Sequence, residues 1–224
     1  MTEIENIEKL INDKEVQFRS FSLNKVEKRQ LEDGTEELVV EGLAAVTNQL
    51  TVLYKGKYYE DREIITSEAF ANSDLSDVIF NFNHCGRVYA RTRNNSLELW
   101  LESDGLHMRA HLRASDNGHQ ELYADIQSGL LDKMSFAFHV SEAHWESYED
   151  EASEYVIYTR YVTGIDKVYD VSVVDIPAYD TTSISARSAF DAERERRNAE
   201  SIKHQAEHEE AVRLAKAKYL YGGN

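Results

Sequence analysis

The strongest constraint on the fold is a predicted β-hairpin in the middle of the chain. Leucines alternate with Ser, Glu and Trp over residues 96–101, Asp104-Gly105 supplies a hairpin turn, and apolar alternation resumes over residues 106–112. Because successive side chains of a strand point to opposite faces, this pattern predicts two antiparallel strands that share one apolar face. A second turn signal, Asp33-Gly34, precedes the apolar segment 38–46.

The remaining segments extend this expectation. Further strands are predicted over residues 16–26, 62–65, 78–84, 131–140, 155–162 and 165–176, with a turn at Gly164 and a stop at Pro177. Residues 47–62 are expected to be irregular, residues 142–154 to separate two strands, and residues 183–187 to add a short strand. Helices are predicted over residues 2–14 and 117–128, the second ending at Gly129. The pattern is typical of an α+β protein that is mainly β: an antiparallel β-barrel or sandwich flanked by helices.

Three domains are expected. Residues 1–15 form an N-terminal amphipathic helix, residues 16–187 form the main β domain, and residues 188–224 form a charged, extended C-terminal helix. The apolar face of this last helix is narrow, so the helix is expected either to be exposed to solvent or to pack against a partner.

Composition excludes several classes of function. The net charge of −16 over 224 residues argues against direct binding to nucleic acid, which needs clustered Lys and Arg. The single cysteine, Cys85, cannot form an intrachain disulfide and indicates a reducing compartment. The sequence contains no stretch of about 20 apolar residues, so no membrane span is expected. The N-terminus lacks the pattern of a signal peptide. No cofactor is expected.

The segment Leu131–Val140 carries the main functional signal. Phe136 and Phe138 share one face of the predicted strand, while Ser135 lies on the other face beside Ala137. A serine nucleophile needs a base to accept its proton and a third group to orient that base. No G-x-S-x-G elbow surrounds Ser135, which argues against an α/β-hydrolase.

Eight histidines are candidates for the base. His139 lies about 13 Å from Ser135 along the strand, which is too far for a direct contact. His84 ends a predicted strand and opens a polar loop, where functional side chains are often presented. The neighbouring Cys85 is expected to be a small buried thiol. His107 and His111 are expected to face solvent, and a metal site of these two with His119 matches no standard spacing, so no metal is expected.

Three motifs resemble the prohead maturation proteases of tailed bacteriophages. They occur in the family's order: Phe82-Asn83-His84, then Met134-Ser135-Phe136-Ala137-Phe138, then the segment Tyr169–Tyr179. The resemblance covers roughly residues 36–187 and includes the hairpin between Arg87 and Arg113. It implies a serine endopeptidase with the fold of the herpesvirus assembly proteases, a small β-barrel surrounded by helices.

The same resemblance implies the roles of individual residues. Ser135 corresponds to the nucleophile, His84 to the general base, and Asp170 to the family's usual Glu that orients the base. Asp166 and Asp175 are nearby rivals for that third role. Two further departures are Cys85, where the family has Asp, and Ala137, where it has Gly.

The expected function is therefore proteolysis in the host cytoplasm, inside an immature phage prohead. The substrates would be a scaffold protein or the scaffold-like segment of the major capsid protein, and the chain's own terminus. A homodimer is suggested by the analogy with assembly proteases alone. The alternative is a binding module, a capsid-assembly or scaffolding factor that kept the fold without its catalytic activity.

Overall fold

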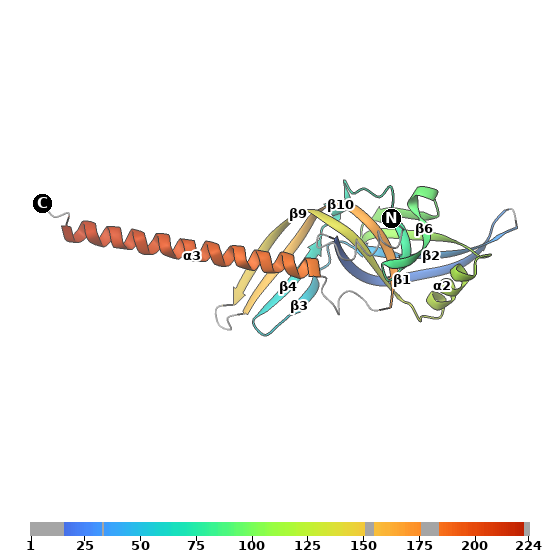
Figure 1. The fold of residues 1–224 in the computed structure, drawn as a ribbon, viewed down its shortest axis with the longest axis horizontal. Helices are drawn as coiled ribbons and strands as arrows, with labels where there is room; N and C mark the ends of the chain where they lie inside the picture. The colour runs from blue at the N-terminus through green and yellow to red at the C-terminus, as the bar shows by residue number, and fades with distance from the viewer. Residues whose placement is uncertain (1–15, 33, 151–154, 176–183, 222–224) are drawn as a thin grey trace. The chain divides into compact units, whose positions relative to one another are not determined.

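The computed structural model describes residues 16–32, 34–150, 155–175 and 184–221, so the predicted N-terminal helix and Pro177 lie outside the described residues. The elements, in order, are β1 Val16–Gln30, β2 Glu36–Val46, β3 Thr51–Lys55, β4 Tyr59–Ile65, η1 Ser67–Phe70, β5 Ile79–Phe82, β6 Cys85–Arg91, η2 Thr92–Asn94, β7 Leu97–Glu102, β8 Gly105–Arg113, α2 Asn117–Gln127, β9 Lys133–Asp150, β10 Tyr155–Val174 and α3 Ile184–Tyr221 (Figure 1). A mainly β chain with helices is therefore confirmed.

The strands form a ten-stranded sheet that stays open. Their order is β3-β4-β10-β9-β1-β2-β8-β7, with β5 beside β10 and β6 beside β5. Within the described residues the end strands β3 and β7 do not pair with each other, so the pairings do not close the sheet into the expected barrel. The expectation of purely antiparallel strands was also wrong, because β10 runs parallel to both β4 and β5.

Both hairpins signalled by Asp-Gly are present. β7 and β8 pair in antiparallel fashion from Leu97↔Ala110 to Glu102↔Gly105, and β1 pairs with β2 on either side of the second turn. At the first turn Gly105 has a φ of 150°, and an added Cβ would lie 1.9 Å from the carbonyl oxygen of Ala45. Only glycine fits this close backbone approach.

Three irregular segments predicted from sequence are in fact regular. The charged residues 142–150 continue β9, because β10 supplies backbone partners from Tyr155↔Asp150 onwards and their mostly exposed faces tolerate charge. Gly164 marks a register shift inside the continuous β10 and does not end a strand. Residues 51–55 and 59–65 form β3 and β4. The short strand predicted over residues 183–187 was also wrong, because α3 begins at Ile184.

One face of the central strands forms the hydrophobic core. Phe80 on β5, Phe136 and Phe138 on β9, and Val171 and Val173 on β10 are all fully buried in one cluster. The Phe136 and Phe138 rings stack with centroids 4.4 Å apart. This parity leaves the opposite face of the same strands to Ser135, Asp170 and the polar residues described below.

The chain divides into two compact units, residues 1–185 and 186–224. In the second unit, ion pairs between residues one turn apart, such as Arg197–Glu193 and Arg196–Glu200, stabilise part of α3. None of the helices in the described ranges is both long and apolar enough to cross a membrane.

Candidate active site

Ser135 and Asp170 are brought together by the pairing of the two longest strands. β9 and β10 are antiparallel, and Ser135 lies directly opposite Ser172, while Ala137 lies opposite Asp170. β10 is irregular between Val168 and Asp170, beside its pairing with Ala137. Asp170 and Ser172 are two residues apart and share a face, as their parity predicts. Ser135 is fully buried, and Asp170 is 2% exposed.

His84 is carried by a tight turn and not by the loop expected from sequence. β5 ends at Phe82, β6 begins at its partner Cys85, and Asn83 and His84 are the two residues between them. Both have positive φ, 51° and 57°, as the two central residues of a type I′ hairpin turn require. Asn and His tolerate this left-handed conformation better than most residues, although it is strained for any side chain with a Cβ.

The turn is fixed to β10 by Asn83. Its backbone N–H donates to the carbonyl oxygen of Val173 at 2.9 Å, and its side-chain Oδ1 accepts from the backbone N–H of Asp175 at 3.1 Å. These two bonds hold the hairpin tip over the strand that carries Asp170. The Phe-Asn-His-Cys sequence could have been recognised as a two-residue turn, because Asn is favoured at positive φ.

The imidazole of His84 lies between the other two groups. Its Nδ1 is 2.7 Å from Oδ1 of Asp170, and its Nε2 is 2.7 Å from Oγ of Ser135. The His84 side chain is 13% exposed, whereas its two partners are more deeply buried. The structure thus brings the three predicted residues together across 51 and 86 residues of sequence.

These contacts define the direction of the hydrogen bonds. An ionised carboxylate only accepts, so Nδ1 of His84 carries the proton and donates it to Asp170. Nε2 is then an acceptor for the hydroxyl of Ser135, which is the arrangement that lets a histidine take a proton from a serine. The side chain of Asp170, although one methylene shorter than that of Glu, is long enough to contact the imidazole of His84 directly.

The alternatives raised by the sequence are placed elsewhere. Asp166, a rival of Asp170, contacts Nδ1 of His139 at 2.7 Å. Asp175, the other rival, is exposed and contributes its backbone N–H to Asn83. The expectation of a buried Cys85 was wrong, because this thiol is exposed at the start of β6.

The three histidines of the metal hypothesis do not converge. His119 is buried and its Nδ1 accepts the backbone N–H of Arg113 at 2.9 Å. His107 contacts Asp104 at 2.7 Å, and His111 contacts Glu37 and Glu98, each at 3.1 Å. Both are partly buried, which corrects the expectation that they face solvent. Among the described residues, the one group with metal-compatible spacing is Glu102, Asp104 and His107, at the turn end of the β7–β8 hairpin.

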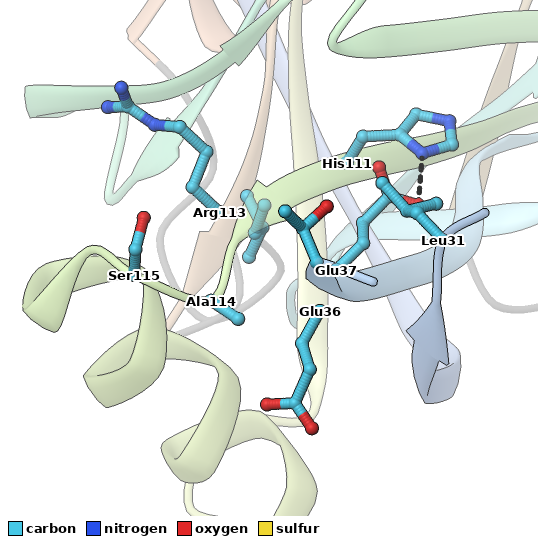
Figure 2. A pocket seen from close by; sticks show the side chains of 9 residues that line it. Leu31, Glu36, Glu37, His111, Arg113, Ala114 and Ser115 are labelled. Atoms are coloured by element: carbon cyan, nitrogen blue, oxygen red, sulfur yellow. Dashed lines mark ion pairs between the residues drawn. The ribbon is translucent and has the colours of Figure 1, made fainter. Parts of the chain in front are cut away.

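A hollow lies at the opposite end of β8 from its Asp-Gly turn. It has a volume of about 520 Å³, and its walls include Leu31, Glu36, Glu37, His111, Arg113 and Ser115. Figure 2 shows these side chains around the opening, with His111 paired to Glu37. Ser135, His84 and Asp170 do not line it, so this hollow is separate from the candidate active site.

Comparison with known proteins gives the family. The model of a family described as caudovirus prohead serine protease matches residues 24–196, a range that includes Ser135, His84 and Asp170. A solved structure of the bacteriophage T4 capsid assembly protease, gp21, is similar with a TM-score of 0.40 and 14% identity, over 71% of this chain and 97% of that chain. No curated protein matches. Because the family model spans well over half of the sequence, the chain belongs to the caudovirus prohead serine proteases.

Proposed function

We propose that the chain is a serine endopeptidase in which Ser135 is the nucleophile, His84 the general base and Asp170 the group that orients the base. The observation that carries this proposal is the pair of 2.7 Å contacts from the two ring nitrogens of His84 to Ser135 and Asp170. Family membership supports the same reaction class.

The geometry supports a two-step hydrolysis. Oγ of Ser135 attacks the carbonyl carbon of the scissile peptide as its proton passes to Nε2 of His84, and the carbonyl oxygen becomes an oxyanion. The C–N bond then breaks, and His84 gives the proton to the departing amine. Water, deprotonated by His84, hydrolyses the acyl-enzyme and restores Ser135. Asp170 stabilises the charge that His84 carries in both steps.

The proposed substrates are the scaffold protein or the scaffold-like segment of the major capsid protein, inside an immature prohead in the host cytoplasm. The family name supports a role in prohead maturation. Cleavage of the chain's own C-terminal part, near residue 188, belongs to the same proposal. A homodimer stays a prediction, which sedimentation of the purified chain would test.

Intact-mass analysis over time tests the proposal directly. The wild type, Ser135→Ala and the control Ser141→Ala are each incubated alone and with the capsid and scaffold proteins of the same virus. Ser141 is an exposed serine on the same strand, so its truncation matches the chemical change without touching the site. Ser135→Ala is expected to reduce cleavage by about 10³-fold or more, because no nucleophile remains.

The possible outcomes separate the two functions considered. Cleavage by the wild type and Ser141→Ala, absent in Ser135→Ala, supports the protease. Equal cleavage by all three proteins would rule out Ser135 as the nucleophile. No cleavage by any of them, with normal shell formation, would favour the assembly factor.

A further inference from the structure

A fourth polar side chain, Ser172, lies against the candidate active site. It is fully buried on β10, opposite Ser135 on β9 and opposite Asn81 on β5. Its hydroxyl lies 2.7 Å from Oδ1 of Asp170 and 3.2 Å from Nδ1 of His84, and it also contacts Oδ1 of Asn81. Three paired strands thus present Ser135, Ser172 and Asn81 in one row on the same face of the sheet.

The directions of the hydrogen bonds in this row follow from the number of protons that the Ser172 hydroxyl and the Asn81 amide can donate. The Ser172 hydroxyl has one proton, yet both of its closest neighbours, Oδ1 of Asp170 and Oδ1 of Asn81, are acceptors. Within the described part of the chain, the buried Nδ2 of Asn81 has no hydrogen-bond partner. Exchanging the O and N positions of this amide, which differ little in shape, removes the conflict between acceptors and gives Nδ2 a partner, while Oδ1 takes the buried position that has none. Nδ2 then donates to Ser172, whose proton is free for Asp170.

The result is a directed chain of donors. With the amide exchanged, Asn81 donates to Ser172, and Ser172 and His84 both donate to the same carboxylate oxygen of Asp170. Two donors to one oxygen fix the rotation of the carboxylate and supply hydrogen bonds to a charge that is only 2% exposed. A carboxylate held in one orientation holds the imidazole in one orientation, with Nε2 directed at Ser135.

We propose that Ser172, supported by Asn81, is a positioning residue that acts on the reaction through Asp170. This inference rests on the proposed function, because it needs His84 to act as a base. It also explains why a serine and an asparagine occupy fully buried sites in adjacent strands, where apolar residues would otherwise pack.

The test is the rate at which a fluorophosphonate probe labels Ser135. In this reaction the serine oxygen forms a bond to phosphorus, fluoride leaves, and the serine proton passes to His84, so the maximal rate reports how well the base is positioned. Labelling is measured on the chain alone and on chain assembled with its capsid and scaffold proteins. The variants are Ser172→Ala, Ser172→Thr, Asn81→Leu, Asp170→Asn and the double variant of Ser172→Ala with Asp170→Asn.

Ser172→Ala is expected to lower the maximal labelling rate about 10- to 100-fold, because a hydrogen bond to a charged group is lost. The probe concentration for half-maximal labelling should not change. Ser172→Thr keeps the hydroxyl and should restore most of the rate, and Asn81→Leu should show a smaller loss than Ser172→Ala. In the Asp170→Asn background, Ser172→Ala should have little further effect, because both act through the same contact.

A matched control separates positioning from a general loss of stability. The Ser73 hydroxyl donates to the carbonyl oxygen of Ile165 on β10 and contacts none of the site residues, so Ser73→Ala should leave labelling unchanged. A wild-type rate in Ser172→Ala would overturn the inference, as would losses that simply add in the double variant. No labelling of the wild type in either preparation would overturn the proposed function itself, and the inference with it.

Discussion

Strand β10 carries two buried polar clusters that differ in kind. Near its start, Arg160 lies opposite Glu63 on β4, and Glu63 also binds Arg19 on β1 through two bonds of 2.6 and 2.7 Å. Near its end lies the site around Asp170. Arg19, Glu63 and Arg160 are each 5% exposed or less, so this first group, the arginine cluster, is as deeply buried as the candidate active site.

The clusters differ in how their charges are satisfied. In the arginine cluster, two guanidinium groups enclose one carboxylate and lie over aromatic faces, Arg19 over Phe138 and Arg160 over Trp145, each at 5.6 Å. Burial is the main cause that lowers the pKa of Arg160 below its usual value, and the nearby Arg19 adds to it, while Glu63 opposes the shift. This geometry joins β1, β4 and β10.

The candidate active site is built from fewer charges. The one carboxylate, Asp170, accepts hydrogen bonds from Ser172 and His84. The series of hydrogen bonds ends at the hydroxyl of Ser135, and its neighbour His84 is partly exposed. Buried ion pairs resist separation, whereas a neutral hydroxyl beside a reachable imidazole can change its bonding during a reaction. The comparison predicts that changes in one cluster mainly affect stability and changes in the other mainly affect activity.

The largest expected effect comes from Asp170→Asn. The amide keeps the shape of the carboxylate but cannot stabilise a charged imidazole or fix its tautomer, so kcat should fall by about 10⁴-fold. The free energy of unfolding should change by less than about 1 kcal/mol, since the hydrogen bonds can largely be retained. Peptide-bond cleavage by intact mass and urea unfolding measure the two quantities. A large loss of stability with normal activity in Asp170→Asn would contradict the prediction that this site mainly affects activity.

The second prediction concerns Glu63→Gln in the arginine cluster. Removing the carboxylate charge leaves Arg19 and Arg160 without their compensating partner at the centre, so unfolding should become easier by about 3–5 kcal/mol. Activity of the folded fraction should be retained. Glu36→Gln is the matched control, because Glu36 forms an exposed ion pair with Lys28 and should contribute less than about 1 kcal/mol. Equal effects of the two variants in urea unfolding would contradict the prediction.

The smallest effect should come from His119, a buried histidine outside both clusters. Burial lowers its pKa, an effect that Asp116 opposes and that Arg87 and Arg113 reinforce. As the pH falls below the unfolded value of about 6.5, the unfolded chain takes up a proton that the folded chain resists, so this contribution to stability is complete above that value and declines below it. The wild type should therefore lose more stability than His119→Gln between about pH 7.5 and about pH 5.5.

Urea unfolding of both proteins at the two pH values measures this difference. His84, the corresponding residue of the candidate active site, is partly exposed and paired to a carboxylate, so the two histidines give a direct comparison of a structural and a reactive environment. Identical pH dependence in the wild type and His119→Gln would contradict the prediction, because it would show that folding does not lower the pKa of His119.

Sequence periodicity predicted much of the local structure. The Asp-Gly turns, the helix ending before Gly129, and the opposite faces of Phe136 and Ser135 all follow from short-range rules on backbone conformation and alternation. The same rules failed for residues 142–150, whose charged composition predicts a separation between two strands although they continue β9. Their strand conformation depends on backbone partners in β10, which lie outside any local window.

The sequence by itself determined which side chains could react: a serine on a small, polar strand face, a histidine next to an asparagine, and an aspartate two residues from a serine. Only the tertiary structure decided that they meet. That meeting requires β5 to run parallel to β10, the Asn83-His84 turn to be bonded to β10, and β9 to pair in the register that sets Ser135 opposite Ser172. Parallel pairing and register are fixed by contacts between residues far apart in the chain, and side-chain alternation along one strand does not encode them.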